Sequence, residues 1–284
     1  MKINPNLLKL AEQTYDPDLK VDTSLVQQPI QTPNINVQNP QDYIILEGRH
    51  GTYEYPDLLV SKYRLSYNPE VEKVANILGL KLSNTSKEKN GRDYIGNINW
   101  INSLRLNLEL NGFTLNPRQG IDFISLLKSG KAFDGNENKI DSKELERILD
   151  EIIGVRNPGR AEWLDADFKY LNKAGKEIQE SEKGNLYIYY NHVRDANGNL
   201  IPRNRKLLEE CLMDNCKIDL SGCNKQGMPT KEGDDINYWR PMKDNNSVAG
   251  FYASSGRALL DCLSDPLLSY SGLGVRIAKI KEQK

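Results

Sequence analysis

The chain has 284 residues, enough for one large domain or two small ones with a buried core. Its 38 Lys and Arg residues nearly balance its 39 Asp and Glu residues, so the formal net charge is −1 and no overall basic field favours nucleic-acid binding. No apolar run approaches the ~20 residues that cross a bilayer, and residues 1–16 lack the apolar core of a secretory signal peptide. We therefore expect no nucleic acid partner and no membrane span. The sequence does not specify a cellular compartment, and the cytoplasm is the default expectation.

Residues 1–40 have the composition of an extended N-terminal arm. Apolar residues recur at helical spacing between residues 4 and 13. Residues 21–41 are instead rich in Pro, Gln, Asn and Thr, a composition that buries little surface. Such an arm either joins subunits of an oligomer or is a loose tail, and the sequence leaves both interpretations open.

Residues 42–153 begin with two short β-type runs, 42–46 and 58–60, and continue with helices. Apolar residues at helical spacing predict the helices over residues 69–82, 98–110, 114–127 and 142–153. Asn116 is expected to cap the third helix, with Pro117 at its first position. Asp141 or Ser142 is expected to cap the fourth helix, which Gly154 should end.

After Gly154 the chain takes on a more β-rich character. Apolar and polar residues alternate over residues 185–192, which predicts a strand, and residues 195–199 form a turn. A short helix is expected at residues 207–213, followed by a loop-like stretch over residues 217–233. The fold class that this order predicts is α+β.

Motifs that would indicate catalysis or calcium binding are incomplete. The only histidines, His50 and His192, have no nucleophile elbow or phosphate loop to act with. Asp134 begins a run that imitates a calcium loop, but Lys139 stands where such a loop needs Gly, and Leu145 stands where it needs Glu. We therefore expect a protein that is not an enzyme, with no catalytic residue and no bound calcium.

The cysteines are Cys211, Cys216, Cys223 and Cys262. In a chain of this length without a signal peptide, free buried thiols are the expected state. We expect no metal and no cofactor, with a metal site or a disulfide as the alternative. Whether the first three cysteines do anything beyond packing is not determined by the sequence.

Residues 248–276 differ in composition from the rest of the chain. They contain no Lys or Glu, although both are frequent elsewhere, and they also lack Gln, Met, Trp and Asn. A regular frame of Ala, Ser, Leu, Cys and Pro is interleaved with residues of no consistent type. This pattern is typical of a scaffold that carries replaceable contacts.

The frame resembles the variable region of target proteins of diversity-generating retroelements, most closely the archaeal variable proteins. Its residues are Phe251, Ala253, Ser255, Ala258, Leu260, Cys262, Pro266, Ser269, Ser271 and Leu273-Gly274-Val275-Arg276. In these systems a reverse transcriptase copies a template repeat, mutates its adenines and writes the copy into the end of the target gene. Residues 48–60 and 156–165 also resemble archaeal members. The resemblance thus covers most of the chain after the arm, but unevenly.

The interleaved positions are consistent with this mechanism. Adenine mutation of Asn codons, the usual targets, cannot produce Lys, Glu, Gln, Met or Trp, and none of these stands at an interleaved position. These positions, which form the expected hypervariable ligand-binding set, are Gly250, Tyr252, Gly256, Arg257, Leu259, Asp261, Leu263, Ser264, Asp265, Leu267, Leu268, Tyr270 and Gly272.

The resemblance implies a C-type lectin fold of the subclass similar to formylglycine-generating enzyme, with a small twisted antiparallel sheet and flanking helices. In that fold an early strand pairs with the last one, so residues 42–46 are expected to pair with residues 275–280. Residues 41–284 would then form one domain, with the variable region at residues 248–276.

The resemblance further implies a ligand-binding protein whose C-terminal surface takes part in protein–protein interaction. Frame residues such as Leu260 and Leu273 are expected to be buried, while the interleaved residues point to solvent. Tyr252 and Tyr270 are the expected anchors, because Tyr gives a large contact area at low entropic cost. The interleaved leucines form an apolar patch or, alternatively, fill the core. The ligand and the oligomeric state are not specified by the sequence.

Two other functions remain open as alternatives. A formylglycine-generating enzyme relies on reactive cysteines near the C-terminus, where this chain has only Cys262. A C-type-lectin-like module of fixed specificity is the other alternative. The Glu-Pro-Asn and Trp-Asn-Asp motifs of calcium lectins are absent, and Trp239 is followed by Arg240 and Pro241.

Overall fold

The computed structural model describes residues 39–48, 53–178, 184–242 and 245–282. The predicted arm, its helix at residues 4–13 and His50 therefore lie outside the described residues, apart from the last two positions of the arm. The described residues form a mixed α+β structure, as the order of elements predicted.

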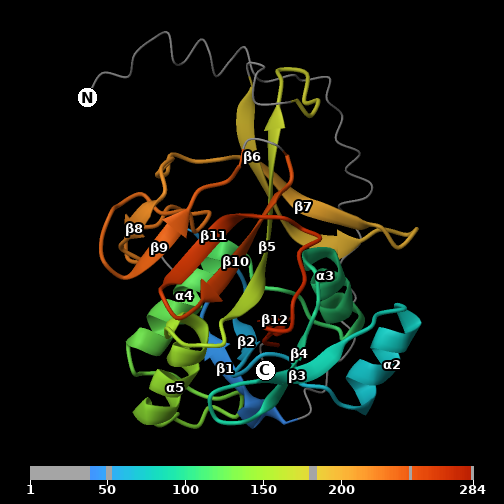
Figure 1. The fold of residues 1–284 in the computed structure, drawn as a ribbon, viewed down its shortest axis with the longest axis vertical. Coiled ribbons are helices and arrows are strands. Elements are labelled where there is room, and N and C mark those ends of the chain that lie inside the picture. Colours follow the sequence, from blue (N-terminus) through green and yellow to red (C-terminus); the bar gives the residue numbers. More distant parts are fainter. Residues whose placement is uncertain (1–38, 49–52, 179–183, 243–244, 283–284) are drawn as a thin grey trace.

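The main layer of the described residues is an eight-stranded sheet. Its order is β7-β6-β5-β10-β11-β9-β8, and β12 pairs with β5 beside this path. Its strands are β5 (Arg160–Leu171), β6 (Asn185–Arg194), β7 (Leu200–Leu207), β8 (Cys216–Ile218), β9 (Ile236–Trp239), β10 (Ser247–Ala253), β11 (Ala258–Ser264) and β12 (Leu273–Gly274). Figure 1 shows β5 running through the centre of the molecule, with β10 and β11 beside it.

Two smaller sheets and the helices surround this layer. The small strands are β1 (Tyr43–Leu46), β2 (Leu58–Ser61) and β13 (Ala278–Ile280) in one sheet, and β3 (Ser83–Lys87) and β4 (Asp93–Gly96) in the other. The helices are α2 (Pro69–Ile77), α3 (Trp100–Glu109), α4 (Pro117–Lys128) and α5 (Ser142–Ile153), and a 3-10 turn spans Pro40–Asp42. The main core lies between α4, α5 and the large sheet, where Phe123, Ile148 and Phe251 are buried.

The expected pairing of residues 42–46 with the last strand is wrong. The sheet order is β1-β2-β13, so β2 lies between the first and last strands and pairs antiparallel with both. Burial explains this order. Leu58, Leu59 and Val60 are all buried, as befits a central strand, whereas burial alternates along β1 as it does in an edge strand.

The helix predictions hold best where capping residues are present. Helix α5 spans the predicted residues, with Asp141 as its N-cap, and α4 begins at Pro117 behind a capping box formed by Asn116 and Gln119. Helix α2 is shorter than predicted and ends at Ile77. Gly79 follows in a left-handed conformation with φ of 66°, which stops the helix.

The helix predicted at residues 207–213 is absent, and β5 was not predicted. Leu207 ends β7, and the backbone of the next residues bonds to a distant loop instead of to itself. The Glu209 amide donates to the Gln226 side chain, and the Leu212 amide donates to the Pro229 carbonyl. These long-range partners replace the i to i−4 bonds of a helix, because a short helix has little stability of its own.

A group of buried charged side chains joins the parts of the fold, and we call it the buried Arg–Glu network. Its members are Arg64, Glu88, Glu151, Arg160, Glu162 and Arg276. All six residues are buried. They come from the segment after β2, the β3–β4 hairpin, α5, β5 and the end of the variable region, so the network ties together elements that are far apart in sequence.

Arg276 makes the most complete set of contacts in this network. Its Nε and Nη2 donate to the two carboxylate oxygens of Glu162, at 3.1 and 2.9 Å. Its Nη1 donates to the carbonyl oxygens of Ser61 and Lys62. Arg64 lies beside this pair and donates to Glu88 at 2.9 Å and to the Ala161 carbonyl.

Replacing Arg276 by Ala should destabilise the fold by about 3–5 kcal/mol, because it removes both hydrogen bonds that Arg276 donates to the buried carboxylate of Glu162. The free energy of unfolding in urea measures this loss. Arg257→Ala is the matched control, since Arg257 is exposed and should cost less than about 1 kcal/mol. Equal costs for the two variants would show that the buried pair does not hold the fold.

Two carboxyl groups of the network, those of Glu88 and Glu151, interact directly, and their pKa values shift in opposite directions. Burial opposes ionisation of Glu88, but the Arg64 guanidinium, the hydrogen bond with Glu151 and the charge of Arg276 together outweigh burial and lower the pKa of Glu88. At Glu151, burial together with the hydrogen bond and the charge of Glu88 raises the pKa to about 7. The folded chain therefore keeps a proton on Glu151 at pH values where the unfolded chain has lost it.

This shift predicts that Glu151 makes the fold less stable as pH rises. The unfolded carboxyl titrates near its ordinary pKa of 4.5, so stability should fall between about pH 4.5 and 7 and stay low above that window. Glu151→Gln should flatten this part of the pH profile of the melting temperature and improve stability relative to wild type at pH 8. A variant that keeps the wild-type slope would rule Glu151 out as its source.

Candidate functional site

The β10–β11 hairpin sorts the frame and the interleaved residues onto its two faces. The strands pair antiparallel, with Tyr252 opposite Leu259 and Ala253 opposite Ala258. Phe251, Leu260 and Cys262 face the main core. Because side chains alternate along a strand, the residues between them face the other side of the sheet. Phe251, Leu260 and Cys262 of the frame therefore lie on the face opposite the interleaved Tyr252, Leu259 and Asp261. A register shift near the end of the hairpin takes Ser264 out of this alternation.

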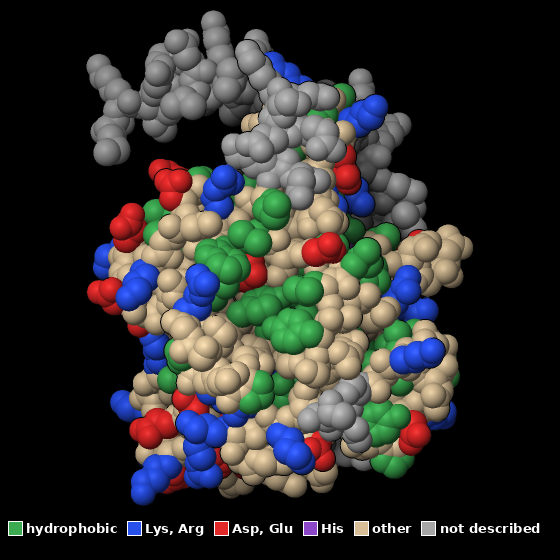
Figure 2. All heavy atoms as spheres, viewed as in Figure 1, with side chains coloured by type: hydrophobic (Ala, Val, Ile, Leu, Met, Phe, Trp, Pro, Cys, Tyr) green, Lys and Arg blue, Asp and Glu red, His purple; other side chains and the backbone are tan. Residues whose placement is uncertain are grey.

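A concave cavity of about 660 Å³ lies on this second face. Ten of the thirteen interleaved residues line it: Tyr252, Arg257, Leu259, Asp261, Leu263, Ser264, Asp265, Leu268, Tyr270 and Gly272. Its other walls include Pro158, Gly159 and Trp239. Figure 2 shows hydrophobic side chains gathered near the middle of the face that β10 and β11 present. The structure thus brings together residues that are spread over twenty-one positions of the chain, from 252 to 272.

Three interleaved residues lie outside the cavity lining. Gly250 is buried in β10, Gly256 is exposed in the hairpin turn, and Leu267 is 66% exposed. Gly272 does line the cavity, but a Cβ atom there would lie 2.4 Å from the carbonyl oxygen of Gly159. A side chain at Gly272 would therefore require the backbone to shift.

The expectation that the interleaved residues point to solvent is wrong for several of them. Leu259, Asp261 and Ser264 are only 4–5% exposed, although all three line the cavity. Strand β11 is flanked by β10 and β9, and the side chains of Asp261 and Ser264 bond to each other and to their neighbours Leu263 and Tyr252. The frame residues Leu260 and Leu273 are buried as predicted and are both fully inaccessible, whereas Ser255, Ser269 and Ser271 of the frame are exposed.

A chain of hydrogen bonds crosses the floor of the cavity. The Tyr252 hydroxyl bonds to the Ser264 hydroxyl at 2.8 Å, and Ser264 donates to Oδ2 of Asp261 at 2.9 Å. The Leu263 amide donates to Oδ1 of the same carboxylate at 2.8 Å. Burial raises the pKa of Asp261, and these two donors act in the opposite direction.

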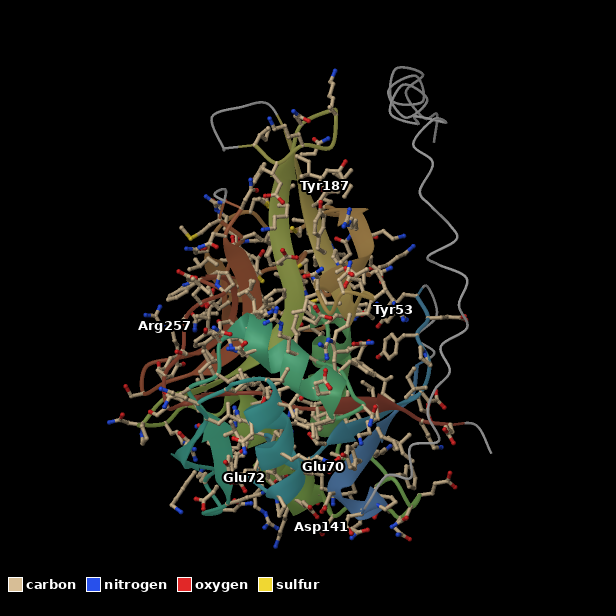
Figure 3. The ribbon with its side chains drawn as sticks, turned by 90° about the vertical axis from the view of Figure 1, so that its right-hand side faces the viewer. Tyr53, Glu70, Glu72, Asp141, Tyr187 and Arg257 are labelled. Carbon is tan, nitrogen blue, oxygen red and sulfur yellow. The ribbon has the colours of Figure 1, made fainter. Side chains whose placement is uncertain are left out.

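Aromatic rings form much of the remaining wall. Tyr252 packs edge-on against the buried Trp163, with ring centroids 6.5 Å apart. Burial raises the pKa of Tyr270 to about 12. At the rim, the Arg257 guanidinium lies over the Trp239 ring, 4.9 Å from its centroid. Figure 3 places Arg257 at the outer edge of the molecule.

Trp239 is a site residue that the sequence patterns missed. It lies at the end of β9, which pairs parallel with β11, with Trp239 opposite Asp261. Its place beside the cavity depends on this long-range pairing, which no local pattern reveals. Pro158 and Gly159 belong to a segment that the family resemblance did single out, although without a role at the site.

His192 has a structural environment away from this cavity. Its Nδ1 lies 2.5 Å from Oδ1 of Asp165, and its ring packs edge-on against Trp100 at 5.1 Å. Burial lowers the pKa of His192, but the hydrogen bond and charge of Asp165 outweigh burial and raise it. An imidazole held between a carboxylate and an aromatic ring is locked in orientation.

The four thiols are all free; Cys262 is buried and the other three are half-buried. Among the described residues, no group of three or more His, Cys, Asp or Glu side chains is arranged to hold a metal ion. At the imitation calcium loop, Asp134 instead accepts the backbone amides of Asn136 and Asn138. Its carboxylate thus closes a polar turn.

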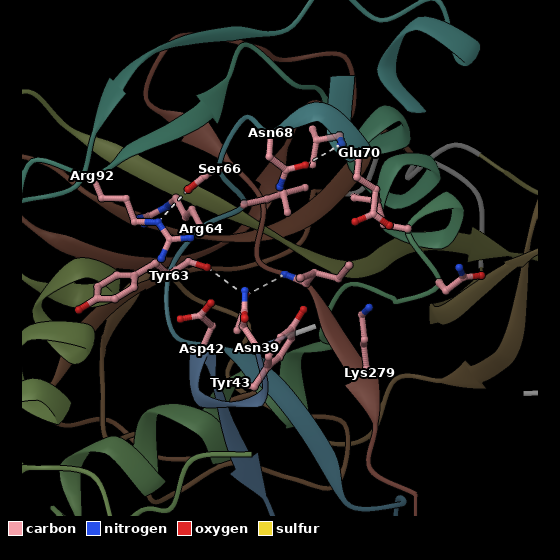
Figure 4. Close-up of a pocket in the computed structure, with 16 residues that line it drawn as sticks. Asn39, Asp42, Tyr43, Tyr63, Arg64, Ser66, Asn68, Glu70, Arg92 and Lys279 are labelled. Atoms are coloured by element: carbon pink, nitrogen blue, oxygen red, sulfur yellow. Dashed lines mark hydrogen bonds between the residues drawn. The ribbon is translucent and has the colours of Figure 1, made fainter. Parts of the chain in front are cut away.

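A second, polar cavity of about 400 Å³ lies beside β2 and α2. Figure 4 shows Arg92, Lys279, Asp42 and Glu70 around it. Arg92 donates to the Ser66 hydroxyl at 2.8 Å and lies over the Tyr63 ring. None of the thirteen interleaved residues lines this cavity.

Comparison of the chain with protein-family models, with curated proteins and with solved structures gives no match. No helix in the described part of the chain is long and apolar enough to cross a membrane.

The two faces of the hairpin should differ sharply in their tolerance of substitution. Leu260→Ala removes a fully buried side chain and should cost about 2–5 kcal/mol. Leu268→Ala makes the same chemical change at a residue that is 39% exposed and should cost less than about 1 kcal/mol. Urea unfolding of both variants checks this. A large loss for Leu268→Ala would mean that the cavity lining is part of the core.

Proposed function

We propose that this chain is a non-catalytic ligand-binding protein whose C-terminal surface is diversified by a retroelement through adenine-directed mutagenesis. In this proposal residues 41–284 form a C-type lectin fold and the ligand is a protein. The observation that carries the proposal is the sorting of the terminal stretch. Ten interleaved residues line one cavity, while Phe251, Ala258, Leu260 and Cys262 of the frame face the core; of the frame residues of the two strands, Ala253 alone also lines the cavity.

The position of the hairpin suits a surface that must change without unfolding. Strand β10 is bonded to β5 on one side and to β11 on the other, and β11 is bonded further to β9. These backbone bonds do not depend on which side chains face the cavity. A site built on central strands is also more rigid than one built on loops.

The chemistry of the cavity supports a protein as the ligand. Tyr252 and Tyr270 offer large rings, and Leu263 and Leu268 add apolar area beside them. Aromatic anchors with adaptable polar neighbours are typical of diversified binding surfaces. Charged residues at the rim, such as Arg257 and Asp265, then add selectivity.

The thiol of the terminal region does not favour the alternative of a formylglycine-generating enzyme. Cys262 is fully buried on the core face, and burial raises its pKa well above the ordinary value for cysteine. A reactive cysteine needs access to substrate and a readily formed thiolate. We therefore assign Cys262 to packing.

Sequencing the DNA around the gene in its source population tests this function. We expect a near-copy of the segment encoding residues 248–276, differing only where the copy carries adenine, together with a reverse-transcriptase gene. Variation among individuals should concentrate at Tyr252, Arg257, Leu263, Leu268 and Tyr270, while codons for β9 serve as the invariant control. An invariant terminal segment with no copy nearby would contradict diversification and leave a binding module of fixed specificity.

A further inference from the structure

Asp261 is a buried carboxylate without a cationic partner. It is only 4% exposed and lines the cavity, and both of its hydrogen-bond donors, the Leu263 amide and the Ser264 hydroxyl, are neutral. Within the described residues, no Lys, Arg or His forms an ion pair with it. By contrast, the buried carboxylates of Glu88 and Glu162 each bond to an arginine. Burying an uncompensated charge is costly, so a compensating group from outside would be bound favourably.

The carboxylate has acceptor capacity left for such a group. A carboxylate offers about four lone-pair sites, and the two donors from Leu263 and Ser264 occupy two of them. Ser264 is itself bonded to the Tyr252 hydroxyl, so the carboxylate is held in one orientation. A fixed acceptor of this kind binds a cation without further ordering of the site.

The walls of the cavity are suited to the rest of a basic side chain. Tyr252, Tyr270 and Trp239 line it, and the faces of such rings attract cations. The chain already uses one of them in this way, since the Arg257 guanidinium lies 4.9 Å from the centroid of Trp239. Leucines such as Leu263 provide apolar contact for the methylene stem that Lys and Arg side chains bury.

We infer that the cavity takes a lysine or arginine side chain of a protein partner, with its charged end at Asp261 and its stem along the leucines. This inference rests on the proposed function of the surface as a protein-binding site. It adds to that function the chemistry of the contact, for the sequence whose structure is described here. Charge complementarity selects the occupant: an acidic side chain would meet an uncompensated carboxylate, and an apolar one would leave that carboxylate desolvated and unpaired.

Selection from a displayed library of random peptides on the full chain tests the inference. Peptides that bind should be enriched in Lys or Arg, and Asp261→Asn should weaken them by about 30-fold or more, because truncating one partner of a buried charge pair raises the dissociation rate. Asn keeps an oxygen acceptor at this position. Asp234→Asn removes the same charge from an exposed side chain outside the cavity and should leave binding unchanged. Thermal melting of both variants verifies that they are folded.

The remaining outcomes separate the inference from the function beneath it. Selected peptides that lack basic residues, or that bind Asp261→Asn as well as wild type, would overturn the cation site while leaving a protein-binding surface. If Asp261→Asn fails to fold, selected peptides whose lysine amines have been converted to amides decide the same point. The inference predicts that these peptides no longer bind the wild-type chain. Failure to select any peptide, or binding that survives Tyr252→Ala with Tyr270→Ala, would contradict the proposed function as well.

Discussion

The ion pair between Arg276 and Glu162 is the constraint on which the rest of the structure depends. Two charged side chains that are almost completely buried can persist only if their geometry is well defined and their remaining donors are satisfied. The Ser61 and Lys62 carbonyls satisfy them here, so the pair fixes β2 and β5 together. Because Arg276 is the last residue of the terminal stretch, the same pair sets the place where that stretch ends. Strand β12 then lies against β5, with Gly274 opposite Glu162.

With its end fixed in this way, the terminal stretch can form two different surfaces from one piece of chain. On β10 and β11, Phe251, Ala258, Leu260 and Cys262 of the frame pack in the main core, while Tyr252, Leu259, Asp261 and Leu263 line the cavity. The loop over residues 265–272 then returns along the cavity and supplies Leu268 and Tyr270. Under the proposed function, stability and recognition are thereby assigned to different positions of the same strands. This division is what a surface of changing sequence requires, because changes on one face leave the packing of the other intact.

Much of this arrangement follows from sequence, and the rest depends on long-range partners. Helices α4 and α5 were predictable because caps at Asn116 and Asp141 combine with regular apolar spacing. Strand β5 was not, because its charged residues resemble a solvated segment until their partners are known. Glu162, for example, is buried against Arg276, 114 positions away. The frame pattern singled out the interleaved residues, ten of which line one cavity, but it did not predict the burial of Leu259 and Asp261. Local alternation shows which face a residue is on and says nothing about what covers that face.

A diversified site also places a demand on the scaffold that the buried Arg–Glu network can meet. Under the proposed mechanism, an Asn codon becomes an Asp codon through mutation of its first adenine, so a position such as Asp261 can acquire a buried charge in one step. That charge destabilises the unliganded protein, since neither of its donors is cationic. The scaffold must therefore hold stability in reserve, away from the cavity, for such variants to stay folded. The contacts of Arg64 and Arg276 lie on β2, α5, β5 and the β3–β4 hairpin, and no interleaved residue takes part in them, although Arg160 of the same network lines the cavity. Under the proposed mechanism, variation at the interleaved positions therefore leaves these contacts of Arg64 and Arg276 in place.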